Sequence, residues 1–208
     1  KTGGLEITSK GDFVHVAFIS DGVFSRNGDV KALAKELELR RSAAHSALSV
    51  LGVNSISFGE FPDNRLDTIA TIEVAQMIEA LIAKYQPQVV FTHHIGDVNV
   101  DHKKVHEATV VACRPQPSFC VKSILCYEVP SSTEWQMSGK RQEFCPNYFV
   151  DISPFLDKKI CSLGHYEFEM RASPHPRSLD MIKHLAHWRG ATIGVTSAEA
   201  FMVGRLIE

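Results

Sequence analysis

Short apolar runs alternate along this chain with longer segments in which apolar residues recur every three or four positions. Residues 13–19 form a β-branched and aromatic run of strand length that ends in a Ser-Asp-Gly turn. Residues 30–51 carry apolar side chains at helical spacing, and Gly52 stands where a helix C-cap belongs. The pattern therefore predicts a strand followed by a helix.

The same alternation continues to the end of the chain. Further strands are predicted at 55–58 and 89–92, with weaker candidates at 123–129 and 148–152. Further helices are predicted at 68–85, from near His102 onward, at 153–170 and at 178–189. Glu199 is predicted to be the N3 residue of a capping box whose N-cap is Thr196.

Alternating strands and helices predict an α/β fold with a Rossmann-like, mostly parallel sheet and helices on both faces. A length of 208 residues suits one such domain better than two. In these sheets ligands bind beyond the carboxyl ends of the strands, so functional side chains are expected directly after strands.

Composition narrows the class of partner. A formal net charge of −2 without a long basic run disfavours nucleic acid and favours a small-molecule substrate. No apolar stretch approaches the roughly 20 residues of a membrane span, so no transmembrane segment is predicted. Five cysteines without a CxxC pair suit reduced thiols in a cytoplasmic protein. A homo-oligomer is compatible with all of these features.

The densest group of titratable side chains follows the predicted strand at 89–92 and extends from His93 to Glu107. Imidazole and carboxylate groups at a strand end suit a metal such as zinc, whose catalytic sites have three protein ligands and one open position. The more specific hypothesis is a metal-dependent hydrolase. The alternative is that some of these side chains cap the helix and the others are only solvated.

The histidines of this group are not equivalent. His93 and His94 are adjacent in extended chain, so they point to opposite faces and cannot both face one site. His102 and His106 are one helical turn apart, but two lysines lie between them where an HExxH motif has its Glu. We therefore predict that His106 is structural and that His102 is the candidate ligand.

Six segments occur in the order of the landmarks of a known family. They are ISDG at 19–22, LGV at 51–53, FPDNRL at 61–66, DVNVDHK at 97–103, YEVPSSTEW at 127–135 and PHPRS at 174–178. Together they resemble the PIG-L/LmbE family of zinc-dependent deacetylases, in its bacterial branch. The resemblance implies an LmbE-like three-layer fold. It also implies a hydrolase that removes the acetyl group from an N-acetylglucosamine-like sugar conjugate, releasing acetate and a free amine.

The resemblance assigns roles to three neighbouring residues. The last His of the family's HPDH-like motif is a zinc ligand and falls on His102, which implies Zn²⁺ or another divalent transition metal as cofactor. Asp101 keeps the preceding Asp, with an implied role in orienting nearby groups. Asn99 replaces a His found in many members, and its amide is predicted to donate to a developing oxyanion without transferring a proton. Asn99 and Asp101 are therefore the predicted catalytic residues.

Four loop residues are predicted to bind the amino-sugar conjugate. Asp63 and Arg65 follow the second predicted strand and would hold sugar hydroxyls or a phosphate. His175 and Arg177 lie in a loop that two prolines stiffen. Solvation is the alternative for Arg65, and helix capping and turn formation are the alternatives for His175 and Arg177. Arg40 is a weaker candidate, because Ala replaces the Glu three residues after it.

One part of the family's pattern does not occur in this sequence. The AHPDDE motif, which supplies the family's other two metal ligands and its general base, is absent from residues 1–208. We expect these residues to form a single deacetylase domain that lacks its N-terminal strand and HPDD-type motif. The alternative is a metal-free member that acts as a binding or regulatory protein. A nucleotide-binding Rossmann module is disfavoured, since the turn at Gly22 lacks the GxGxxG fingerprint.

Overall fold

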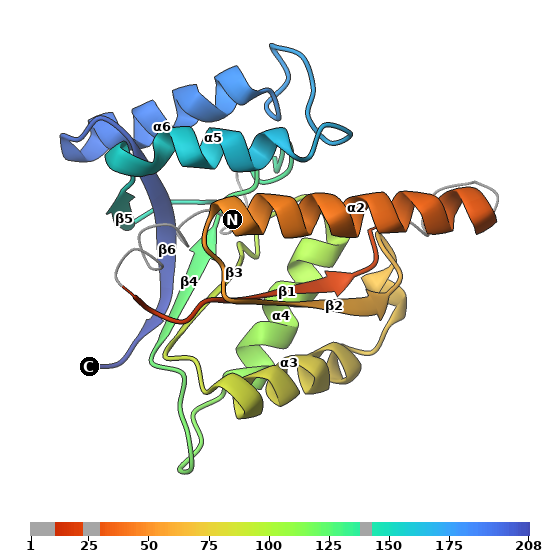
Figure 1. The fold of residues 1–208 in the computed structure, drawn as a ribbon. Coiled ribbons are helices and arrows are strands. Elements are labelled where there is room, and N and C mark those ends of the chain that lie inside the picture. The colour runs from red at the N-terminus through yellow and green to blue at the C-terminus, as the bar shows by residue number, and fades with distance from the viewer. Residues whose placement is uncertain (1–10, 23–29, 138–142) are drawn as a thin grey trace. The chain divides into compact units, whose positions relative to one another are not determined.

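A computed structural model (Figure 1) describes residues 11–22, 30–137 and 143–208. These residues fall into two compact units. The first unit contains the described residues up to Asp63 together with Phe149–Glu199. The second contains Asn64–Tyr148, apart from residues 138–142, and Ala200–Glu208. A single domain over residues 1–208 stays a prediction.

The first unit is built on two parallel strands, β1 (His15–Ser20) and β2 (Ser55–Phe61), joined through the long helix α2 (Val30–Val50). Buried Leu48 of α2 packs among apolar side chains of both strands, including Phe18 and Ile56. The predicted C-cap is confirmed, because Gly52 has a left-handed φ of 71° and donates its N–H to the Ser49 carbonyl at 3.0 Å.

Two more helices complete the first unit. They are α5 (Leu156–Gly164), preceded by the 3₁₀ turn η2 (Ser153–Phe155), and α6 (Leu179–Ile193), which packs on α5. Ser178 caps α6 by accepting the Met181 N–H at 3.2 Å. The predicted helix at 153–170 is too long. The helix α5 ends at Gly164 in a tightened last turn. In this turn the His165 N–H bonds to the Ser162 carbonyl, and the Tyr166 N–H bonds to the Leu163 carbonyl.

The second unit contains three hydrogen-bonded strands. Strand β3 (Val89–His93) pairs in parallel with β4 (Ser123–Tyr127), which pairs antiparallel with β6 (Ala198–Leu206). Helices α3 (Thr71–Tyr85) and α4 (Val100–Ala112) pack against each other, and α4 also contacts β3 (Figure 1). Strand β5 (Tyr148–Asp151) begins at Tyr148, the last residue of the Asn64–Tyr148 segment. Its other residues belong to the first unit.

The fold is mixed α/β, as predicted, with corrections at element ends. The 3₁₀ turn η1 (Leu66–Thr68) precedes α3, so that helix begins at Thr71 and not at Thr68. The capping box predicted at Thr196 is wrong, because residues 198–206 form β6. Glu199 instead accepts a hydrogen bond from Lys159 Nζ at 2.6 Å. Pairing partners distant in sequence outweigh a local capping pattern here.

Candidate functional site

The candidate site lies within the second unit, at the end of β3 and the start of α4. Three loops meet the first turn of α4: residues 64–66, residues 94–99 and residues 128–134. β3 and β4 are parallel, so their carboxyl ends, at His93 and Tyr127, lie at the same edge of the sheet. This is the edge at which α/β folds bind ligands.

Asn99 is the N-cap of α4. Its side-chain oxygen accepts the N–H of Asp101 at 2.8 Å and that of His102 at 3.3 Å. Its amide nitrogen donates to the side-chain oxygen of Asn64 at 3.3 Å. The cap therefore fixes where the first turn of α4 begins, and with it the position of His102.

Asp101 fastens the 64–66 loop to α4. Its carboxylate accepts the N–H of Asn64 at 2.6 Å and that of Leu66 at 3.0 Å. Leu66 is fully buried, so its N–H has no access to water and needs a partner within the protein. The structure thus gives Asp101 a positioning role in a loop that includes Arg65.

Asp97 is the most enclosed acid of the site, with no exposed surface. Its Oδ1 accepts the Asn99 N–H at 2.8 Å and the Ser132 hydroxyl, and its Oδ2 accepts the Thr133 hydroxyl at 2.9 Å. Oδ2 also lies 3.1 Å from His102 Nδ1. Burial by itself would raise the pKa of Asp97, but His102, Ser132 and the Asn99 N–H outweigh it and lower that pKa. Asp97 is therefore a buried carboxylate anion.

The His102 ring is packed against a second imidazole. The rings of His93 and His102 stack with centroids 4.1 Å apart and 14° between their planes. His93 Nε2 lies 3.2 Å from the Tyr127 hydroxyl. Burial raises the pKa of Tyr127, and Asp97 raises it further, so the phenol stays protonated. The stack and the Asp97 contact together restrain the His102 ring on its face and on its edge.

The two other histidines of this stretch contact the backbone. His94 is buried, and its Nδ1 accepts the Gly96 N–H at 3.1 Å. Burial lowers the pKa of His94, with a smaller contribution from His106, which keeps the His94 imidazole neutral. His106 Nδ1 donates to the His93 carbonyl at 2.9 Å. Their ring contacts are structural.

The predicted substrate-binding residues are divided between the units. Arg65 is exposed in the second unit, and Asp63 is the last residue of the first segment of the first unit. His175 Nδ1 accepts the Arg177 N–H at 3.1 Å, and Arg177 pairs with Glu169 at 2.8 Å, both within the first unit. Glu169 also forms an ion pair with Arg40, so the structure brings this weaker candidate together with Arg177.

His102 fits the role of a single metal ligand. A carboxylate on one ring nitrogen is the usual support of a metal-binding His, because it leaves the other nitrogen to face the metal. Asp97 Oδ2 lies 3.1 Å from His102 Nδ1, so the pair comes close to this arrangement, although the two groups are not aligned as a hydrogen bond. Across residues 11–22, 30–137 and 143–208, no group of three or more His, Cys, Asp or Glu side chains is placed to hold a metal ion.

Sequence reasoning missed Asp97, Ser132 and Thr133 as parts of one cluster. Asp97 stood within the titratable stretch, but nothing local distinguished it from its neighbours. Ser132 and Thr133 are 35 and 36 residues away from it in the chain. The only signal was that 97–103 and 127–135 both carry the family resemblance.

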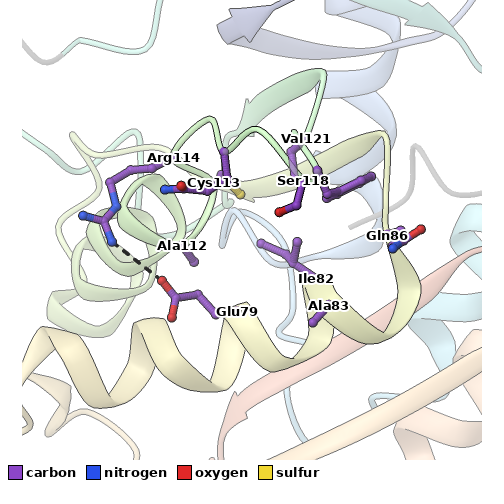
Figure 2. A pocket seen from close by; sticks show the side chains of 11 residues that line it. Glu79, Ile82, Ala83, Gln86, Ala112, Cys113, Arg114, Ser118 and Val121 are labelled. Atoms are coloured by element: carbon purple, nitrogen blue, oxygen red, sulfur yellow. Dashed lines mark ion pairs between the residues drawn. The ribbon is translucent and has the colours of Figure 1, made fainter.

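A separate cavity of about 290 Å³ lies at the other end of α4 (Figure 2). Its walls come from the C-terminal parts of α3 and α4 and the segment after α4, and include Ile82, Cys113 and Phe119. Glu79 and Arg114 also line the cavity and form an ion pair at 3.9 Å. None of the titratable residues of the candidate site lines this cavity.

Among the helices of the described residues, none has the length and apolar character that crossing a membrane requires.

Comparison with known proteins relates the chain to one family. The model of the PIG-L family, described as GlcNAc-PI de-N-acetylase, matches residues 4–113. A curated relative, the uncharacterized deacetylase YaiS of Escherichia coli (strain K12), is 28% identical over 137 residues, which cover 62% of this chain. The match covers 65% of that relative, just under two thirds of its length.

Solved structures share the fold over nearly the whole chain. N,N'-diacetylchitobiose deacetylase from Pyrococcus horikoshii matches with a TM-score of 0.78 at 18% identity, covering 97% of this chain and 76% of that one. GalB, the 4-carboxy-2-hydroxymuconate hydratase of Pseudomonas putida KT2440, matches with a TM-score of 0.75 at 19% identity, covering 100% of this chain and 91% of that one. The fold is therefore shared by proteins described as a deacetylase and as a hydratase.

Proposed function

The chain belongs to the PIG-L family of GlcNAc-PI de-N-acetylases, and on this premise we propose that it is a metal-dependent N-deacetylase. The substrate in this proposal is an N-acetylglucosamine-like sugar conjugate, and the products are acetate and a free amine. The deacetylase relatives in Escherichia coli and Pyrococcus horikoshii support the reaction class.

One observation carries the proposal: the buried Asp97 carboxylate lies 3.1 Å from Nδ1 of His102, at the carboxyl end of β3. A buried acid that supports an imidazole at this edge of an α/β sheet is typical of a metal-binding His. His102 is also the residue on which the family's ligand position falls. A divalent metal such as Zn²⁺, when bound, would polarise the acetamide carbonyl and make a water molecule more acidic.

The chain's own residues then have distinct roles. His102 would hold the metal through Nε2. The Asn99 amide has two N–H groups, one of which bonds to Asn64, and we assign the second to the developing oxyanion. Asp101 positions the 64–66 loop, where Arg65 is exposed and free to reach polar groups of the sugar conjugate.

In the first unit, the proposed sugar-binding residues are His175, Arg177 and Asp63, which is the last residue of that unit's first segment. Arg177 is held by Glu169, and its backbone N–H bonds to His175, so the two side chains form one ordered group. A preorganised group of this kind loses less conformational entropy when a sugar binds.

The test is acetate release by the metal-loaded, full-length protein from a panel of N-acetylglucosamine conjugates with lipid, nucleotide and inositol aglycones. The His102→Ala variant is the control, and it should lose activity on every conjugate that the wild type hydrolyses. Hydration of an unsaturated carboxylic acid without acetate release would replace the proposal with the hydratase chemistry of the GalB neighbour. Inactivity of a metal-loaded protein on both classes would favour a binding role.

A further inference from the structure

We infer that Asp97, held by Ser132 and Thr133, is a positioning residue that fixes His102 in the tautomer with its proton on Nδ1 and leaves Nε2 as the metal-binding atom. The part of this inference that concerns the metal rests on the proposed function. The part that concerns the tautomer rests on geometry alone.

The direction of each hydrogen bond around Asp97 follows from its partners. The Asn99 N–H can only donate, so Asp97 Oδ1 is an acceptor. The Thr133 hydroxyl accepts the Val129 N–H at 2.7 Å, and its own proton then points to Asp97 Oδ2 at 2.9 Å. Both oxygens of Asp97 are therefore acceptors.

His102 Nδ1 is buried and lies 3.1 Å from the acceptor Oδ2 of Asp97, without the alignment of a full hydrogen bond, and this contact favours a proton on that nitrogen. A lone pair on Nδ1 would instead face the lone pairs of Oδ2, which is repulsive in a buried setting. The proton on Nδ1 leaves the lone pair of a neutral imidazole on Nε2. His102 is thus oriented before any metal binds.

The carboxylate itself is held firmly. Asp97 is fully buried, and its hydroxyl partners come from the turn after β4, which is closed by bonds from the N–H groups of Ser132 and Thr133 to the Val129 carbonyl. Glu134 also accepts the Ser132 N–H at 3.2 Å. A turn ordered in this way leaves Asp97 little freedom to release His102.

The face of the ring is restrained as well as its edge. His93 stacks on His102 with ring centroids 4.1 Å apart, and the Tyr127 hydroxyl contacts His93 Nε2 at 3.2 Å. A partial rotation of the His102 ring would break the stack, and a half-turn would replace Nδ1 with a ring carbon beside Asp97. A ring restrained on its face and its edge presents Nε2 in one direction.

The direct test is the tautomer of His102, read from long-range ¹H–¹⁵N NMR spectra of the metal-free, full-length protein at a pH of about 8, where an ordinary imidazole is neutral. We expect a proton on Nδ1 and a bare Nε2 in the wild type. A wild-type His102 with its proton on Nε2 would overturn the inference, whatever the variants do.

Asp97→Asn extends the test, because an amide can donate as well as accept and no longer requires a proton on Nδ1. The variant should show a mixture of tautomers. Asp101→Asn is the matched control, since it also removes a buried carboxylate from the first turn of α4 but one that bonds to Asn64 and Leu66. It should leave the tautomer unchanged. An Asp97→Asn spectrum identical to the wild type would also contradict the inference.

Metal affinity is the second readout. Asp97→Asn should weaken Co²⁺ or Zn²⁺ binding about 10- to 100-fold, the usual effect of losing the partner of a metal-binding His. Thr133→Val, which removes one support of Asp97, should weaken it less. A correct tautomer in a protein that binds no metal would reject the proposed function and leave the positioning role standing. Metal binding with unchanged affinity in Asp97→Asn would reject the positioning role and leave the function standing.

Discussion

The two ends of helix α4 differ in the polarity of their buried side chains. At the N-terminal end, Asn99, Asp101 and Asp97 use their polar groups to join three loops to the helix. At the C-terminal end, Cys113 packs with Val121 around an apolar cluster beside the cavity of Figure 2. Buried polar side chains are concentrated at the N-terminal end, whereas the ion pair of Glu79 and Arg114 at the C-terminal end is accessible to solvent.

This difference shows where the buried polar groups of α4 are concentrated. The buried polar groups of the N-terminal end bond to one another and to the backbone, because they need hydrogen-bond partners within the protein. It also lies at the carboxyl edge of β3 and β4, where the positive end of the helix dipole favours the Asp97 and Asp101 carboxylates. Changes at this end should therefore cost more activity than equal changes at the other.

The largest effect within this comparison is expected for Asn99. Asn99→Ala removes the proposed oxyanion donor and should lower kcat on the order of 100-fold, with little change in KM. Asn99→Asp keeps the cap of α4 but has no amide donor, so it should retain stability and still lose kcat. Steady-state measurements of acetate release give kcat and KM. The metal content of each variant is measured in the same preparations.

If the metal-loaded Asn99→Ala enzyme retained the kcat of the wild type, Asn99 would be a helix cap only. The oxyanion donor would then have to lie elsewhere.

Asp101→Ala should have the next largest effect, and on stability first. It leaves the buried Leu66 N–H without its partner, and the Asn64 N–H as well, so we expect a loss of about 2 to 3 kcal/mol in the free energy of unfolding. The matched change at the opposite end is Cys113→Ala, which removes one buried sulfur and should cost about 1 kcal/mol. Urea unfolding of both variants measures the difference.

The comparison of ends fails if Cys113→Ala lowers kcat as much as Asp101→Ala does. In that case the apolar end of α4 would matter to catalysis as much as the polar end.

The smallest expected effect is a difference in the rates at which buried and exposed cysteines are alkylated. Burial raises the pKa of Cys113 and of Cys126 to about 11, whereas Cys145 and Cys161 are exposed. Iodoacetamide at neutral pH should label the exposed pair and spare the buried pair. The neutral form of the buried thiols is favoured in the folded state. Their contribution to stability is therefore complete below the unfolded pKa of about 8.5 and falls as the pH rises toward 11.

Peptide mapping by mass spectrometry reads the labelled positions. Labelling of Cys113 as fast as Cys161 in folded protein at pH 7 would show that the cavity end of α4 opens readily.

Much of the fold could be predicted because its signals are local. The apolar spacing of 30–51 and the Gly52 cap are properties of neighbouring residues, and α2 ends as expected. The capping pattern at Thr196 was local too, but β6 pairs with β4 across more than 70 residues, and that pairing prevailed. Local patterns fail where a distant strand offers more hydrogen bonds.

The site was predictable to a similar extent. The stretch around His102 could be found from its density of titratable groups and its place after a strand. The support of Asp97 by Ser132 and Thr133 could not, because only the pairing of β3 with β4 brings the loops after them together. The sequence identified Asn99 and Asp101, but their hydrogen bonds to the helix and to the 64–66 loop depend on the three-dimensional structure.

The central claim is that the polar end of α4 holds a metal through His102, and metal content tests it most directly. The full-length protein, purified without chelators and exchanged into metal-free buffer, should retain about one equivalent of zinc or another divalent transition metal, as expected of a catalytic site. His102→Ala should retain almost none, while its circular dichroism stays that of the wild type. A folded His102→Ala variant with full metal content and undiminished acetate release would contradict the account.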